Sequence, residues 1–200
     1  MSSFKDRLEI LEHDLKSTPP AFTMSSELPF AIFRYDPYNA EEREWRVRHE
    51  INLLATRIQN QTNRTVRILP LSKLFWQSIK ESEGVEALIE LEKQQGYVNV
   101  EEQINQYLTD PDWRPLTDLL VEELNKLKPD TGIVFLTRAT VFAPASYRIS
   151  TLLEQLHGRT RVPAVLFYPG SWTGSLNYMG LRKTDEPLGS YRVKIYGRES

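Results

Sequence analysis

The chain has 200 residues, a formal net charge of −2 at pH 7 and no cysteine. This length suits one domain with a substantial core. The lack of cysteine excludes disulfides, thiolate metal sites and a cysteine nucleophile. The first residues lead into charged ones and not into an apolar run, and no stretch approaches the roughly eighteen apolar residues of a membrane span. We therefore expect a cytoplasmic protein without a signal peptide and without membrane contact.

Charge is distributed unevenly along the chain. Residues 81–130 contain 13 acidic and 4 basic side chains, whereas residues 138–200 contain 9 basic and 4 acidic ones. These segments are either two ordinary solvated faces or an acidic and a basic docking face. A nucleic-acid-binding surface is normally more strongly and more locally basic than the second segment.

The front of the chain predicts alternating helices and strands. Apolar residues recur at helical spacing within residues 1–20, before a pair of prolines, and this helix either packs on the domain or docks on a partner. The apolar run at residues 29–33 predicts a buried strand, and residues 65–69 predict a second one. Between them we expect a helix over about residues 40–60, with an inward stripe of Trp45, Ile51, Leu54 and Ile58.

The acidic middle of the chain predicts helices alone. Residues 83–128 read as wholly helical, with Gly96 as a C-cap and with Asn99 and Glu102 as a capping-box start for the next helix. This segment interrupts the alternation of strands and helices. We therefore interpret residues 81–130 as a helical insertion in a single α/β domain that spans the whole chain.

The last third of the chain returns to alternation. Residues 132–137 and 162–168 predict strands on either side of a helix over about residues 144–157, and residues 176–179 and 191–196 predict two short strands. Continuously apolar strands between amphipathic helices are typical of a parallel sheet covered on both faces. The predicted fold class is α/β, with a mostly parallel sheet of four to five strands flanked by helices and a small C-terminal β extension that adds an antiparallel edge.

Polar and turn residues follow three of the predicted strands, where open α/β sheets bind their ligands. These residues are Arg34 and Asp36, Arg138, Tyr168 and Gly170. If the strands are parallel neighbours, the residues meet at one sheet edge. They then form either a ligand or contact site, or an internal set of polar contacts.

Patterns that carry catalysis are missing from the sequence. The turn after the first strand, residues 34–39, has neither the glycines nor the lysine of a phosphate loop. His13, His49 and His157 are far apart and match no metal-binding spacing. No GxSxG elbow occurs. We predict no catalytic residue, no cofactor and no metal, and hence no enzyme.

A second candidate surface combines arginines with aromatic residues near the end of the chain. Its members are Arg159, Arg161, Trp172, Tyr178, Arg182, Tyr191 and Arg192. Trp, Tyr and Arg are the residue types enriched at the centres of protein interfaces, but they also stack on single-stranded nucleic acid. We favour a protein interface, because the positive charge of this region is modest.

One long run of residues resembles a known family. Residues 150–170, STLLEQLHGRTRVPAVLFYPG, are similar to the hallmark stretch of the BrxB family, a component of the BREX bacteriophage-exclusion systems. The motif FRYDP at residues 33–37, Gly180, and the pair Tyr191 and Arg192 also resemble the family pattern. The resemblance covers nearly the whole chain and is weakest in the acidic helical segment.

The resemblance implies a role in phage defence, beside a methyltransferase, a large ATPase and the phosphatase-like protein PglZ. It implies no assigned catalytic residue and points to association with PglZ or with other BREX proteins. The first hypothesis is thus a non-catalytic adaptor or scaffold. The alternatives are a DNA-contacting module of the same complex, or a degenerate nucleotide-binding domain with its ligand near Asp36, Arg138 and Tyr168.

Overall fold

The computed structural model of the chain describes residues 3–24, 28–142, 147–172, 176–178 and 193–197. The chain forms two compact units. Unit 1 comprises residues 1–69, 127–139 and 161–200, and unit 2 comprises residues 70–126 and 140–160. Within the described ranges, no helix is both long and apolar enough to cross a membrane.

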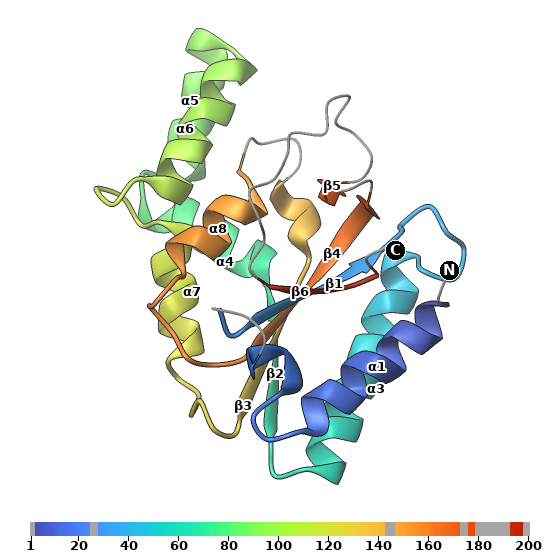
Figure 1. The fold of residues 1–200 in the computed structure, drawn as a ribbon. Coiled ribbons are helices and arrows are strands. Elements are labelled where there is room, and N and C mark those ends of the chain that lie inside the picture. The colour runs from blue at the N-terminus through green and yellow to red at the C-terminus, as the bar shows by residue number, and fades with distance from the viewer. Residues whose placement is uncertain (1–2, 25–27, 143–146, 173–175, 179–192, 198–200) are drawn as a thin grey trace. The chain divides into compact units, whose positions relative to one another are not determined.

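Unit 1 is built on a sheet with the strand order β2-β3-β4-β1-β6 (Figure 1). The strands are β1 (Phe30–Tyr35), β2 (Thr65–Pro70), β3 (Gly132–Thr137), β4 (Ala164–Trp172) and β6 (Lys194–Tyr196). β1 pairs in parallel with β4 and β6, and β3 pairs in parallel with β4. The short strand β5 (Leu176–Tyr178) pairs with the end of β4 in the antiparallel sense. The predicted α/β fold with a mostly parallel sheet is confirmed, although β6 joins the edge as a parallel strand.

Continuous burial explains why the inner strands could be found from the sequence. Every residue of β1 and β3 is buried, as is β4 up to Gly170. A strand covered on both faces needs apolar residues at every position, so it reads as a short uninterrupted run. The edge strand β2 is mostly half-exposed.

Two helices cover one face of this sheet. These are α1 (Phe4–Lys16) and α3 (Glu44–Gln61), and the short helix α2 (Ala21–Met24) adds Phe22 to the same core. Leu8, Leu11 and Leu15 of α1 are buried in this core, so the front helix packs on its own domain. At the centre, the ring of Phe33 contacts the rings of Phe4, Phe167 and Tyr196.

The inward stripe of α3 differs from the prediction at its first residue. Trp45 is 58% exposed, and Val47 is buried in its place. Successive residues of an α-helix are rotated by about 100°, so Val47 falls in line with Ile51, Leu54 and Ile58, whereas Trp45 points to the opposite side. The helix also begins four residues later than predicted, because residues 36–43 form a structured loop.

Glu12 joins α1 to α3, and this contact predicts a pH-dependent contribution to stability. Its carboxylate accepts a hydrogen bond from Arg57 Nε at 2.7 Å and pairs with Lys16 Nζ at 2.8 Å. Burial raises the pKa of Glu12, but these two partners outweigh burial and hold the pKa below its ordinary value of 4.5. A lowered pKa in the folded state stabilises the fold above the ordinary value, and this stabilisation is lost as the pH falls through the folded value.

We therefore expect Glu12→Gln to lower the free energy of unfolding by up to about 1 kcal/mol at pH 7, since the pair is partly exposed. The deficit should narrow at pH 3.5. Urea unfolding at the two pH values measures it, and Glu9→Gln, an exposed position on the same helix, is the control. An equal deficit at both pH values would contradict this account.

Unit 2 is helical. Its elements are α4 (Leu71–Glu81), α5 (Gly84–Gln95), α6 (Tyr97–Thr109), α7 (Leu116–Leu124) and α8 (Ile149–Gln155), with the 3-10 helix η1 (Ala139–Phe142) at its boundary. α6 packs beside α4, α5 and α7, and α8 packs against α7. The segment predicted as wholly helical is interrupted at residues 110–115. There Asp110 Oδ1 accepts a hydrogen bond from the amide of Asp112, and positions 111 and 115 are prolines.

α5 and α6 form a hairpin joined by one glycine (Figure 1). Gly96 is the C-cap of α5, as predicted, with φ +83°. The predicted capping box is wrong: α6 begins directly at Tyr97, and the side-chain amide of Asn99 donates to the carbonyl of Gln95. The predicted helix at residues 144–157 is shorter in the structure, and residues 143–146 lie outside the described part.

Substituting Gly96 by alanine should destabilise the chain by about 2 kcal/mol, because its backbone conformation is open almost only to glycine. No atom lies within 4 Å of the added Cβ, so the loss would measure backbone strain and not a clash. Gln94→Ala, an exposed position in the adjacent turn, is the control. Urea unfolding of both variants tests this, and equal stabilities would refute the strain.

Candidate functional site

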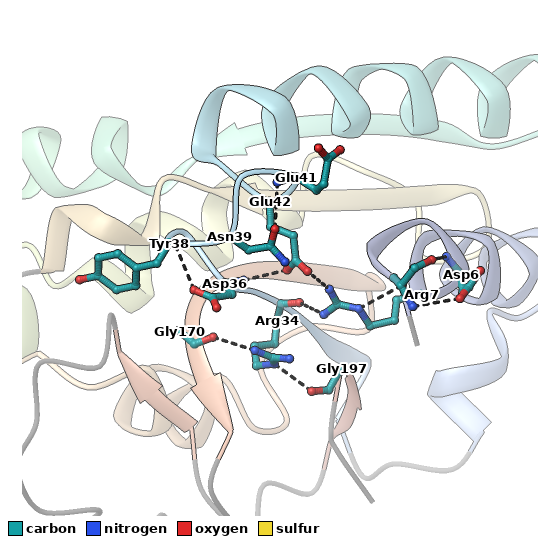
Figure 2. Close-up of polar contacts among 11 residues, drawn as sticks. Asp6, Arg7, Arg34, Asp36, Tyr38, Asn39, Glu41, Glu42, Gly170 and Gly197 are labelled. Carbon is teal, nitrogen blue, oxygen red and sulfur yellow. Dashed lines mark hydrogen bonds and ion pairs between the residues drawn. The ribbon is translucent and has the colours of Figure 1, made fainter. Parts of the chain in front are cut away.

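The carboxyl end of β1 holds a buried arginine that joins three segments. Arg34 Nε donates to the carbonyl of Gly197 at 2.8 Å, and Nη1 donates to the carbonyl of Gly170 at 3.1 Å (Figure 2). Arg34 also lies opposite Tyr168 in the register of β1 and β4. The structure thus brings together three of the residues predicted at the sheet edge, and the guanidinium of Arg34 holds the end of β4 and the residue after β6.

A second buried arginine, Arg7 of α1, was not singled out from the sequence. Its Nη1 donates to the carbonyl of Arg34 at 2.7 Å, and its Nη2 forms an ion pair with Glu42 Oε1 at 2.6 Å (Figure 2). The Arg7 and Glu42 side chains are 5% and 8% exposed. The guanidinium also lies over the ring of Phe33, with 5.5 Å to the centroid. A charged pair this deep requires close to complete pairing of its polar atoms.

Glu42 also anchors the loop between β1 and α3. Its second oxygen, Oε2, accepts a hydrogen bond from the amide of Asp36 at 2.8 Å. Asp36 Oδ1 in turn accepts from the amide of Tyr38, and Asn39 Oδ1 accepts from the amide of Glu41 (Figure 2). The Asp36 carboxylate therefore shapes its own turn, as Asx residues commonly do.

Gly197 closes this arrangement from the far end of the sequence. It follows β6, has φ +92°, and a Cβ there would lie 2.5 Å from Arg7 Nη1. Only glycine allows the backbone to approach the two arginines so closely. Nearby, Asp14 accepts hydrogen bonds from Tyr196 and Lys194, which fasten β6 to α1. Burial, followed by the bond to Asp14, raises the pKa of Tyr196 well above its ordinary value.

The remaining predicted residues do not join this cluster. Arg138 follows β3, which lies two strands away from β1. The residue is exposed, and its backbone has φ +58°. Arg159 of unit 2 is exposed and pairs with Asp118 at 2.7 Å. Arg161 is exposed in unit 1, and Trp172 is half-buried at the end of β4. Tyr178 ends β5, and Arg182, Tyr191, Arg192 and Gly180 lie outside the described residues.

In the described ranges, no group of three His, Asp or Glu side chains is placed to hold a metal ion. At the carboxyl end of β1, the guanidinium groups of Arg7 and Arg34 are directed at carbonyl and carboxylate oxygens of the chain itself. This arrangement stabilises the sheet edge, and it leaves these charges engaged within the protein.

Comparison with known proteins places the chain in a family. The family model described as "BREX protein BrxB" matches residues 67–194, more than half of the chain. The chain belongs to the BrxB family. A relative from Bacillus cereus (strain H3081.97), described as "BREX protein BrxB", is 26% identical over 157 residues, which cover 76% of this chain and 75% of the relative. No solved structure matches the chain.

The BrxB family model matches only some of the residues that meet at the carboxyl end of β1. The matched residues include β2 from residue 67 onward, the whole of unit 2, β3 and β4, and therefore Tyr168 and Gly170. They also include the run at residues 150–170 on which the resemblance rested, so that resemblance is confirmed. Arg7, Arg34 and Glu42 lie before the matched region.

Proposed function

We propose that this chain is a non-catalytic adaptor of a BREX anti-phage defence complex in the cytoplasm, and that it binds the phosphatase-like protein PglZ. Membership of the BrxB family supports a role in BREX. The resemblance described above points to PglZ as the partner, because both proteins belong to the same system.

The observation that carries the adaptor proposal is the internal use of charge at the carboxyl end of β1. Parallel α/β proteins bind ligands at this end of the sheet. Here Arg34 is bonded to two carbonyls of the chain, and Glu42 is bonded to Arg7 and to a backbone amide. Because these charged side chains bond to the chain itself, the arrangement supports a scaffold more than a reaction centre.

Exposed aromatic side chains support docking of a protein. Tyr38, Trp45, Trp76 and Tyr97 are between 48% and 70% exposed. Aromatic side chains of this kind supply much of the binding energy at the centres of protein interfaces. Both units carry such residues, so the adaptor has more than one surface available for partners.

The test is size-exclusion chromatography with light scattering on the full chain, alone and mixed with PglZ from the same operon. We expect a nuclease-resistant complex of defined stoichiometry. Two separate peaks at high micromolar concentration of each protein would refute the pairing. If this chain and PglZ associate only through co-purified DNA, the adaptor role is refuted, and a DNA-contacting role is favoured instead.

That second candidate is a DNA-contacting module of the same complex. It is favoured by the exposure of Arg138 and Arg161 in the basic segment of unit 1. Phosphate contacts release counterions, so such binding must weaken steeply with salt. A DNA affinity that falls by an order of magnitude between 50 and 200 mM salt, and falls further on Arg138→Ala and Arg161→Ala, would support it.

A further inference from the structure

The α5–α6 hairpin, residues 84–109, has few buried side chains. Among its residues only Leu88, Tyr107 and Leu108 are buried. Two apolar side chains at its tip are exposed instead: Tyr97 by 60% and Val98 by 55%. Both side chains leave more than half of their surface in water, and neighbouring exposed apolar side chains are candidate contacts for a binding partner.

The base of the hairpin is fixed to the rest of unit 2. The hydroxyl of Ser78, fully buried in α4, lies 3.1 Å from the carbonyl of Tyr107 and 2.6 Å from that of Arg114. The ring of Tyr107 packs edge-on against Trp113, 5.1 Å between centroids, and its hydroxyl donates to Glu83. These contacts hold the base of the hairpin in place, and a preorganised surface loses less conformational entropy on binding.

The hairpin is strongly acidic. It contains Glu86, Glu90, Glu92, Glu101 and Glu102 but a single basic residue, Lys93, which pairs with Glu90 at 2.7 Å. Glu92 and Glu102 are exposed on the two helices. The negative electrostatic potential of these glutamates repels nucleic acid and anionic membranes and attracts a basic protein surface.

We propose that the α5–α6 hairpin is the docking arm of this adaptor, and that it inserts Tyr97 and Val98 into an apolar recess rimmed by lysine and arginine side chains on its protein partner. The proposal rests on the adaptor function proposed above and assigns the surface that performs it. The apolar tip supplies binding energy, and the glutamates on the helices steer the approach and select a basic rim.

The test compares variants of the full chain in binding to PglZ from the same operon, measured by calorimetry. Tyr97→Ser with Val98→Ser should weaken the complex about 30-fold or more, as expected for residues at the centre of an interface. Both side chains are exposed, so thermal unfolding of this variant should match that of the wild type. The matched control, Ile10→Ser with Leu53→Ser, removes two exposed apolar side chains from unit 1 and should change the affinity less than about threefold.

A second pair of variants tests the charge. Glu92→Gln with Glu102→Gln and Glu9→Gln with Glu50→Gln change the net charge equally, but only the first pair lies on the hairpin. The first pair should weaken binding about tenfold at low salt and flatten its salt dependence, whereas the second pair should have little effect.

The outcomes separate the two proposals. A wild-type complex that is unaffected by both hairpin variants would overturn the docking arm and leave the adaptor function standing. A complex lost through the unit 1 control, with the tip variant still bound, would likewise move the interface to unit 1. Failure of the wild-type chain to bind would overturn the adaptor function and the docking arm together.

Discussion

Replacing Arg7 with methionine is expected to lower the free energy of unfolding by about 3–5 kcal/mol, the usual cost of removing one partner of a buried ion pair. Glu42 would keep its charge in a site where its side chain is 8% exposed and where its only charged neighbour, among the contacts described, has gone. The carbonyl of Arg34 would also lose its donor. Methionine retains most of the apolar stem, so the loss reports on the charge and not on a cavity.

Urea unfolding at pH 7 measures the effect of Arg7→Met. Lys5→Met, an exposed position on the same helix, is the control and should change stability by less than about 0.5 kcal/mol. The double variant Arg7→Met with Glu42→Gln should recover at least ~1 kcal/mol, because the unpaired charge is then gone. A double variant that loses the full sum of both single effects would contradict a direct pairing.

Arg7 illustrates what an amphipathic pattern hides. It lies directly before Leu8 on the buried side of α1, and Asp14 lies on the same side one residue before Leu15. A charged residue beside an apolar stripe is normally assigned to the solvent face. Its burial depends on partners from remote segments, namely Glu42 for Arg7 and β6 for Asp14. Periodicity contains no information about such partners.

The inner strands could be predicted because their signal is local. β3 has the predicted bounds, and β1 and β4 lie within a few residues of theirs. Each is buried along its length, so the apolar run is the strand itself. The start of α3 was missed because its signal is not local. A glutamate at position 42 favours a first helical turn, but the Glu42 carboxylate accepts hydrogen bonds from Arg7 and from the amide of Asp36 in the preceding loop.

The sheet-edge residues could be predicted only in part. The carboxyl ends of parallel neighbours share an edge, which is why Arg34, Tyr168 and Gly170 meet. The contact of Arg34 with Gly197 spans 163 residues and depends on β6 joining β1, a pairing that no short-range pattern indicates. Arg138 failed to join because β4 separates β3 from β1.

Arg34→Met should lower the free energy of unfolding by about 2–4 kcal/mol. The guanidinium donates to the carbonyls of Gly170 and Gly197, and each buried acceptor left without a donor costs about 1–3 kcal/mol, partly offset by relaxation. Arg34→Lys should fall between the wild type and Arg34→Met, because an ammonium cannot reproduce the planar fork that reaches two carbonyls at once. Asp36→Asn keeps an oxygen acceptor for the amide of Tyr38 and should cost less than about 1 kcal/mol.

The same Arg34 variants decide between a structural and a binding role for the sheet edge. If the guanidinium serves the fold, Arg34→Met will lose stability in urea unfolding, and at 10 °C, where the folded state still dominates, it will bind PglZ with the wild-type affinity. A ligand or contact site at this edge makes the reverse prediction, with stability retained and binding lost. Arg34 donates to Gly170 in β4 and to Gly197 after β6, so we expect the loss of stability with wild-type affinity. Retained stability with lost binding would instead make Arg34 and Gly170 functional residues.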